Sequence, residues 1–150
     1  MIRVVAGIIE LQGQLLICQR RRGSVFALKW EFPGGKVRRC ETPWEALTRE
    51  LREELAVEAR IGRQIYQVQH RYAETDEEYQ LSFFLVTLLT ANRTTSERHA
   101  IHAFPPVRNR VFERIRWVRP ADLQRYDFLA GDRSLVARLA RSEFLNLTTA

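Results

Sequence analysis

The sequence lacks any long hydrophobic run. No apolar stretch among its 150 residues approaches the roughly 20 residues that a membrane-spanning helix needs. Its first ten residues also lack the basic start, apolar stretch and small-residue cleavage site of a secretory signal peptide. We therefore expect a cytoplasmic protein without a membrane partner.

Cysteine and histidine are also scarce. Cys18 and Cys40 are the only cysteines, and the histidines are His70, His99 and His102. The cysteines form no C-x-x-C pair, and the histidines do not complete a zinc-ligand pattern. We therefore expect two reduced thiols and no zinc site.

The composition does not fit a disordered chain or a chain of several domains. Hydrophobic residues make up 45% and charged residues 28%, which is typical of soluble globular proteins. A chain of 150 residues can bury one sizeable core, so we predict one domain over residues 1–150. Lysine and arginine outnumber aspartate and glutamate by 24 to 18, and this excess favours a polyanionic partner such as a nucleotide or nucleic acid.

Short apolar runs between turn residues predict β-strands. The predicted strands comprise residues 4–10, 15–20, 66–72, 79–89 and 115–118. The first two flank Gly13 and resemble a β-hairpin, and the next two flank a polar turn at residues 74–77. Residues 91–110 are polar and basic and are interpreted as a flexible flap.

Residues 42–55 contain a full set of helix signals. Thr42 is suited to the N-cap, Pro43 to the first helical position, and Glu45 to a capping box with Thr42. One apolar stripe follows at a spacing of four and consists of Leu47, Leu51 and Leu55.

A second helix is predicted from Arg133 to about Leu145, with Asp132 as a possible N-cap. Its apolar face consists of Leu135, Val136, Leu139 and Ala140. Strands that alternate with helices predict an α/β layered domain.

The first helix also places three carboxylates on one face. Glu50 and Glu54 lie about 40° apart around the helix axis, and Glu53 lies about 60° to the other side of Glu50. Two interpretations follow from the residues alone. The face is either a solvated surface with ion pairs to neighbouring arginines, or a set of oxygen ligands for Mg²⁺ or Mn²⁺.

The segment around this helix resembles the Nudix box. Gly35, Glu41 and the run "RELREELAV" at residues 49–57 match the box in spacing, over residues 35–57. The preceding "WEFPGGKV", residues 30–37, resembles the MutT-like branch of the family. This resemblance implies a Nudix fold, which is an α/β/α sandwich around a mixed β-sheet.

The resemblance also implies a metal site and a catalytic group. The Gly35 carbonyl and the carboxylates of Glu50, Glu53 and Glu54 would hold Mg²⁺, with Mn²⁺ as a substitute. Glu50 or Glu53 is the candidate general base, and Glu113 or Glu97 in the later loop is an alternative. Arg49 would orient the carboxylates together with Glu41.

Substrate contacts follow from the resemblance in the same way. Arg20 and Lys36 would contact phosphate, although Arg20 fits a solvated cation equally well. Phe32 is either a base-stacking residue or a core residue. Asp132 is either the helix cap or a group that recognises the base edge, where an ionised carboxylate accepts hydrogen bonds but cannot donate them.

Two residues depart from the family pattern. Cys40 and Ala56 stand where the box has glycine, so we expect strain at both positions if the backbone there is left-handed. Both changes alter the shape of the backbone rather than the metal ligands.

The expected function is MutT-like hydrolysis of a nucleoside triphosphate to the monophosphate and pyrophosphate, with removal of oxidised dGTP from the nucleotide pool as one role. The enzyme alternatives are CTP or dCTP, ADP-ribose and dinucleoside polyphosphates. The alternative from another class is a non-catalytic nucleotide or RNA binder that uses the flap arginines Arg93, Arg98, Arg108 and Arg110. We expect a monomer or a homodimer.

Overall fold

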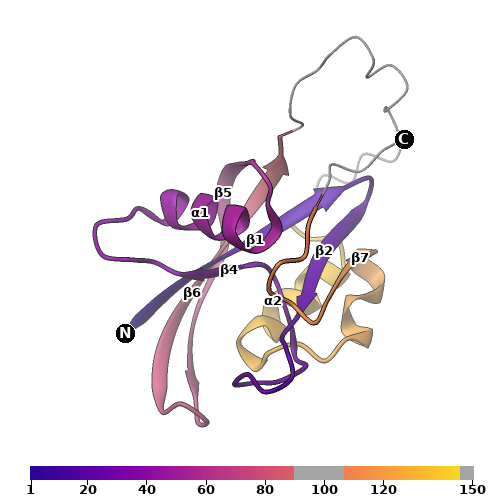
Figure 1. Cartoon of the computed structure of the whole chain (residues 1–150). Helices are drawn as coiled ribbons and strands as arrows, with labels where there is room; N and C mark the ends of the chain where they lie inside the picture. Colours follow the sequence, from indigo (N-terminus) through magenta and orange to yellow (C-terminus); the bar gives the residue numbers. More distant parts are fainter. Residues whose placement is uncertain (90–106, 146–150) are drawn as a thin grey trace.

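A computed structural model describes residues 1–89 and 107–145 of the protein. These residues form a mixed β-sheet with one α-helix on each face (Figure 1). The strands are β1 (Ile2–Leu11), β2 (Gln14–Gln19), β3 (Trp30–Glu31), β4 (Gly34–Lys36), β5 (Ala59–Tyr72), β6 (Glu77–Leu88) and β7 (Arg114–Val118). The helices are α1 (Pro43–Leu55), the 3-10 helices η2 (Pro120–Arg125) and η3 (Ala130–Asp132), and α2 (Arg133–Ala140).

The sheet is organised around β1. Its strand order is β3-β2-β1-β6-β5, with β4 paired to β1 and β7 paired to β2. The β1–β6 pair is parallel, and the other pairs are antiparallel. Strand β4 pairs with β1 at Gly34 and Gly35, so β1 fixes the position of these two residues, which are called the glycine turn below.

The five predicted strands are all present, and β5 is longer than predicted. It begins at Ala59 rather than at residue 66. Register shifts between Ile61 and Tyr66 interrupt the two-residue alternation on which a strand prediction depends. The short strands β3 and β4 were not predicted, because a two- or three-residue strand has no periodicity to detect.

Helix α1 forms as its sequence signals predict. Thr42 is the N-cap, and it exchanges the two hydrogen bonds of a capping box with Glu45. Leu47, Leu51 and Leu55 are fully buried against one face of the sheet. Burial of each leucine contributes about 1.5–3 kcal/mol, so this stripe fixes the helix and thereby its carboxylate face.

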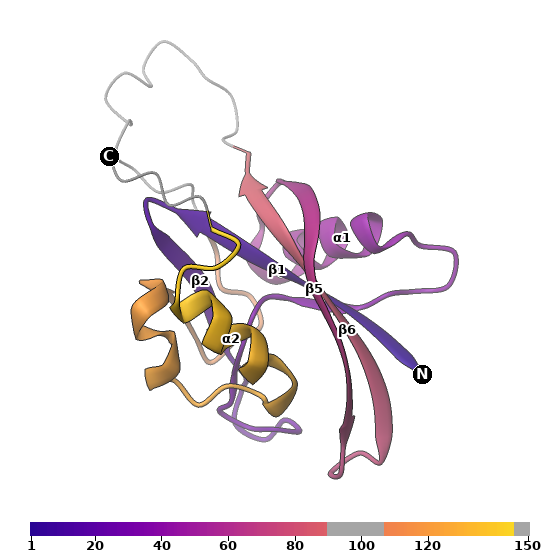
Figure 2. The same cartoon turned by 180° about the vertical axis from the view of Figure 1, so that it is seen from behind.

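Helix α2 covers the opposite face of the sheet, where Leu135, Val136 and Leu139 are buried (Figure 2). This arrangement confirms the predicted α/β/α sandwich. The predicted end at Leu145 is wrong, since the helix ends at Ala140 and left-handed backbone at Ser142 and Phe144 follows.

The predicted capping role of Asp132 is wrong as well. Asp132 occupies the N-cap position of α2, but its side chain makes no capping hydrogen bond. The Asp132 side chain is buried, and the Phe32 backbone N–H lies near its carboxyl group, where it partly offsets the rise of the Asp132 pKa. The side chain therefore points into the protein rather than along its own helix.

Both departures from the box pattern adopt left-handed backbone. Cys40 has a φ of 67°, and Ala56, the C-cap of α1, has a φ of 55°. A residue with a Cβ in this region costs roughly 1–2 kcal/mol relative to glycine. The chain thus keeps left-handed backbone at Cys40 and Ala56, where the Nudix box has glycine, despite the strain.

Three further expectations concern the cysteines, the membrane and the flap. Cys18 and Cys40 are both free thiols, as predicted. Within the two described ranges, no helix combines the length and apolarity that crossing a membrane requires. Residues 90–106, and with them Glu97, Arg93 and Arg98, lie outside the described residues.

Residues 107–110, the described end of the predicted loop or flap, form no helix or strand and are hydrogen-bonded to α1. The Arg108 backbone N–H donates to the Leu55 carbonyl oxygen at 2.9 Å, and the Arg110 N–H donates to the Glu54 carbonyl oxygen at 3.0 Å. This segment therefore lies beside the last turn of α1.

Candidate active site

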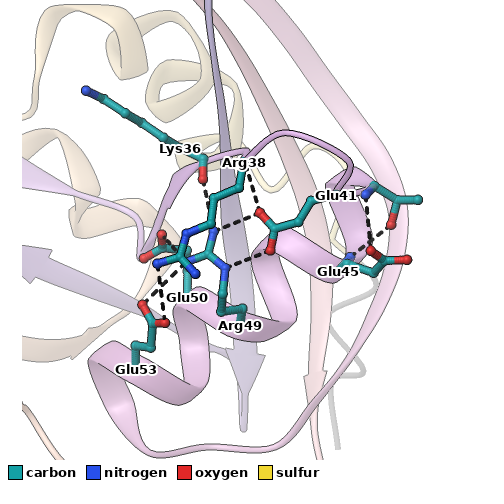
Figure 3. Close-up of polar contacts among 8 residues, drawn as sticks. Lys36, Arg38, Glu41, Glu45, Arg49, Glu50 and Glu53 are labelled. Atoms are coloured by element: carbon teal, nitrogen blue, oxygen red, sulfur yellow. Dashed lines mark hydrogen bonds and ion pairs between the residues drawn. The ribbon is translucent and has the colours of Figure 1, made fainter.

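Arg49 organises the carboxylates of the box (Figure 3). Its Nε and Nη2 donate to the two carboxylate oxygens of Glu41 at 2.7 and 2.9 Å. Its Nη1 donates to Glu50 at 2.8 Å and to Glu53 at 3.4 Å. The guanidinium also donates to the Lys36 carbonyl oxygen at 3.1 Å, so one side chain joins the glycine loop to α1.

The Arg49–Glu41 pair has a pH-dependent effect on stability. The Arg49 hydrogen bond and the Arg38 backbone N–H lower the pKa of Glu41 from 4.5 to about 2. A lowered pKa stabilises the folded state above the ordinary pKa, and the stabilisation is lost as pH falls through about 2. We predict that Glu41→Gln lowers the melting temperature at pH 6–7 and that the two melting temperatures converge as the pH approaches 2.

Thermal unfolding followed by circular dichroism between pH 2 and pH 7 measures this difference. Glu74→Gln, which removes an exposed carboxylate from the turn between β5 and β6, is the control and should track the wild type. A constant difference between Glu41→Gln and wild type over the whole pH range would show that the ion pair is not its source.

Glu50 lies directly against the glycine turn. A Cβ on Gly35 would come within 2.5 Å of Glu50 Oε1, so only glycine allows the carboxylate to approach this closely. Burial raises the pKa of Glu50, while the Arg49 hydrogen bond lowers it in part. The Glu50 carboxylate thus contributes to the packing of the glycine turn against α1.

Glu54 is the most buried carboxylate of the box and lines a cavity. The Gly34 N–H donates to its Oε1 at 3.0 Å. Burial, and then the charges of Glu31 and Glu50, raise the pKa of Glu54 to about 9. A divalent cation would relieve this crowding of negative charge, and carboxylate oxygens are the ligands that Mg²⁺ and Mn²⁺ prefer. The carboxylate oxygens of Glu54 and its acidic neighbours therefore fit such an ion.

The three box carboxylates do not yet converge on one point. Glu53 is half exposed, with 51% of its side chain accessible, and it lies 3.9 Å from Arg38 and 3.4 Å from Arg49. Among the described residues, no group of three acidic, cysteine or histidine side chains stands ready to hold a metal ion. Glu50 and Glu53 are held by Arg49, whereas Glu54 accepts from the Gly34 N–H.

The cavity beside the glycine turn has a volume of about 620 Å³. The predicted site residues that line it are Arg20, Phe32, Gly35, Lys36, Glu54 and Asp132. The predicted site residues that do not line it are Glu41, Arg49, Glu50 and Glu53. The predicted residues thus form two groups. One group lines the cavity, and the other lies on α1 or just before it; Gly35 and Glu54 connect the two groups.

Arg20 is held in place at the cavity wall. Its Nη1 donates to Glu31 at 3.0 Å, and its Nε donates to the Val25 carbonyl oxygen at 2.9 Å. The guanidinium is thus ion-paired with Glu31, and 31% of the Arg20 side chain is exposed. Lys36 remains exposed, and its ammonium group points away from Arg49 (Figure 3).

Phe32 and Asp132 are two buried residues of the cavity wall. Phe32 is 2% exposed and packs against Phe83 and Phe128, so it belongs to the core as well as to the cavity wall. Asp132 is 6% exposed. Burial, and then the charge of Glu31, raise the pKa of Asp132 well above its ordinary value, which favours a protonated carboxyl group that can both donate and accept.

Sequence reasoning missed several cavity residues. Glu31 lies between the buried Trp30 and Phe32, and its charge acts on both Glu54 and Asp132. An acidic residue between two aromatic residues was the available signal. Tyr72 also lines the cavity, but nothing in its surrounding sequence marks it. Glu113, the alternative base, pairs with Arg22 at 3.4 Å and does not line the cavity.

Comparison with known proteins gives a consistent set of relatives. The NUDIX domain family matches residues 1–139. A CTP pyrophosphohydrolase of Escherichia coli is 55% identical over 62 residues, covering 41% of this chain and 46% of that protein. An 8-oxo-dGTP diphosphatase of Haemophilus influenzae is 48% identical over 67 residues, covering 44% of this chain and 48% of that protein. The chain thus spans about half the length of these two relatives.

One solved structure extends the similarity over nearly the whole chain. The solution structure of the E. coli ORF135 protein is 30% identical with a TM-score of 0.71, and it covers 97% of this chain and 95% of that one.

Proposed function

The chain belongs to the NUDIX domain family, and from this premise we propose that it is a hydrolase dependent on a divalent cation, which cleaves a nucleoside triphosphate to the monophosphate and pyrophosphate. The supporting observation is that Gly34, Gly35 and the half-buried Glu54 line the same cavity as Arg20 and Asp132. A triphosphate at the glycine turn would thus place its base toward Asp132. Residues 1–150 are proposed to act as one domain.

Attack of water on a phosphorus atom spreads negative charge over the phosphoryl oxygens, so positioning and charge neutralisation provide most of the catalysis. Glu50, Glu53, Glu54 and the Gly35 carbonyl would hold Mg²⁺, or Mn²⁺ in its place, and the bound ion would neutralise phosphate charge. Arg20 and Lys36 add positive charge at the cavity.

Arg49 acts as a positioning residue, because it holds Glu41 and Glu50 without lining the cavity. Glu53 is the better candidate for the general base. It is half exposed and therefore within reach of water, and its contact with Arg49, at 3.4 Å, is longer than the 2.8 Å contact of Glu50.

Specific observations favour two nucleobases, oxidised guanine and cytosine. Relatives named 8-oxo-dGTP diphosphatase support oxidised guanine and a role in sanitation of the nucleotide pool. A relative named CTP pyrophosphohydrolase supports cytosine. A cavity of about 620 Å³ suits one nucleoside, so ADP-ribose and dinucleoside polyphosphates would extend beyond it.

A substrate screen tests this proposal. The purified protein is incubated with Mg²⁺ and canonical or oxidised nucleoside triphosphates, ADP-ribose or a dinucleoside polyphosphate, and the products are identified. We expect monophosphate and pyrophosphate from 8-oxo-dGTP or from CTP. Absence of turnover on every compound, together with RNA binding that weakens steeply with salt, would support the non-catalytic binder instead.

A further inference from the structure

Tyr72 places a hydroxyl group in the cavity wall, at the end where the nucleobase is proposed to bind. It is the last residue of β5, it lines the cavity, and it is 7% exposed. The Gly131 N–H donates to its hydroxyl oxygen at 3.0 Å. Since Asp132 is the next residue after Gly131, the hydroxyl and the Asp132 carboxyl group are neighbours on one wall.

The hydroxyl has a proton to donate. A tyrosine hydroxyl group is one donor and also an acceptor, and Gly131 uses its accepting side. Among residues 1–89 and 107–145, no acceptor is found within hydrogen-bond distance of this proton. Burial, and then the charge of Asp132, raise the pKa of Tyr72 to about 12, so the proton remains in place at neutral pH.

The position of the hydroxyl is tightly fixed. A Cβ on Gly131 would lie 2.6 Å from the Tyr72 hydroxyl oxygen and 2.6 Å from Leu81 Cδ1, so only glycine permits this contact. The ring is held by aromatic neighbours, with centroid distances of 4.7 Å to Phe26, 4.4 Å to His70 and 5.5 Å to Tyr79. A donor with so little freedom is suited to selection between ligands.

We propose that the Tyr72 hydroxyl group donates a hydrogen bond to the O6 carbonyl of a guanine-type base, and that it thereby favours 6-oxopurine nucleotides over adenine nucleotides. This inference rests on the proposed function. Guanine presents O6, an acceptor, beside N1–H, a donor. The Tyr72 donor and a carboxyl oxygen of Asp132 complement that pair. Adenine presents an amino group in place of O6, so two donors would face each other.

Tyr72→Phe tests the inference because it removes the hydroxyl and keeps the ring. We expect kcat/KM for 8-oxo-dGTP and dGTP to fall about three- to tenfold, mainly through KM, and kcat/KM for dATP not to fall. The triphosphate of 2-aminopurine deoxyriboside, which lacks O6, should be hydrolysed equally by wild type and variant. Tyr66→Phe is the matched control, since its hydroxyl donates to Ser134 outside the cavity.

An equal loss on all substrates, or no loss on the guanine nucleotides, would overturn the inference. Binding of dGMP and dAMP, measured by calorimetry, separates this result from a failure of the proposed function, because binding needs no turnover. If the wild type binds dGMP no better than Tyr72→Phe does, the inference fails whether or not the protein is a hydrolase. A melting temperature for each variant shows whether the variant is folded under the assay conditions.

Discussion

Glu53→Gln is expected to lower kcat by about a thousandfold while leaving the protein folded. The substitution removes a carboxylate that is proposed both to hold the cation and to accept a proton from water. Its side chain is 51% exposed and forms surface ion pairs with Arg49 and Arg38, so we expect the fold not to depend on it. Steady-state kinetics in Mg²⁺ and a thermal melt of the same sample measure both quantities.

Glu58→Gln is the matched control for this substitution. Glu58 is an exposed glutamate that pairs with Arg52 just beyond the end of α1, so the control removes a similar ion pair outside the site. We expect it to retain wild-type kcat. If Glu53→Gln keeps more than a tenth of the wild-type kcat, Glu53 is neither the base nor an essential ligand.

Gly35→Ala is expected to lower kcat by about a hundredfold. The added Cβ would lie 2.5 Å from Glu50 Oε1, so the carboxylate must move away from the turn and from its hydrogen bond with Arg49. A displacement of about 1 Å in a catalytic group commonly costs two orders of magnitude in rate. Kinetics and a crystal structure of the variant would together relate the loss of rate to the displacement of Glu50.

Gly13→Ala is the control for the general effect of replacing a glycine. Gly13 has a φ of 77° in the β1–β2 turn, and nothing lies within 4 Å of an added Cβ. We expect this variant to lose stability through backbone strain and to keep its kcat. Similar kcat values for Gly35→Ala and wild type would contradict the close packing of Glu50 on the turn.

Local sequence signals predicted the parts of the fold that depend on neighbouring residues. Thr42, Pro43 and Glu45 define the start of α1 because capping involves residues only three positions apart. The strain at Ala56 was predictable for the same reason, since the helix end imposes its own backbone conformation. The box glutamates could be found because one helix turn sets their spacing.

Contacts between distant segments were not predictable in this way. The capping interpretation of Asp132 failed because its carboxyl group is buried near the Phe32 N–H, one hundred positions earlier in the chain. Tyr72 was missed because its position depends on Gly131, which is distant in the sequence and lies beside it in the fold. Glu31 was missed for the same reason. Its charge acts on Glu54 and Asp132, which the fold brings to the same cavity.

A manganese titration tests the central claim most directly, namely that the carboxylates of α1 and the glycine turn hold a divalent cation at the cavity. Free Mn²⁺ is followed by electron paramagnetic resonance in the presence of protein and a non-hydrolysable nucleoside triphosphate analogue, with the analogue alone as the blank. We predict saturable binding to the wild type and at least about tenfold weaker binding to Glu53→Gln and to Glu54→Gln. Equal Mn²⁺ binding by the wild type and both variants would contradict the account.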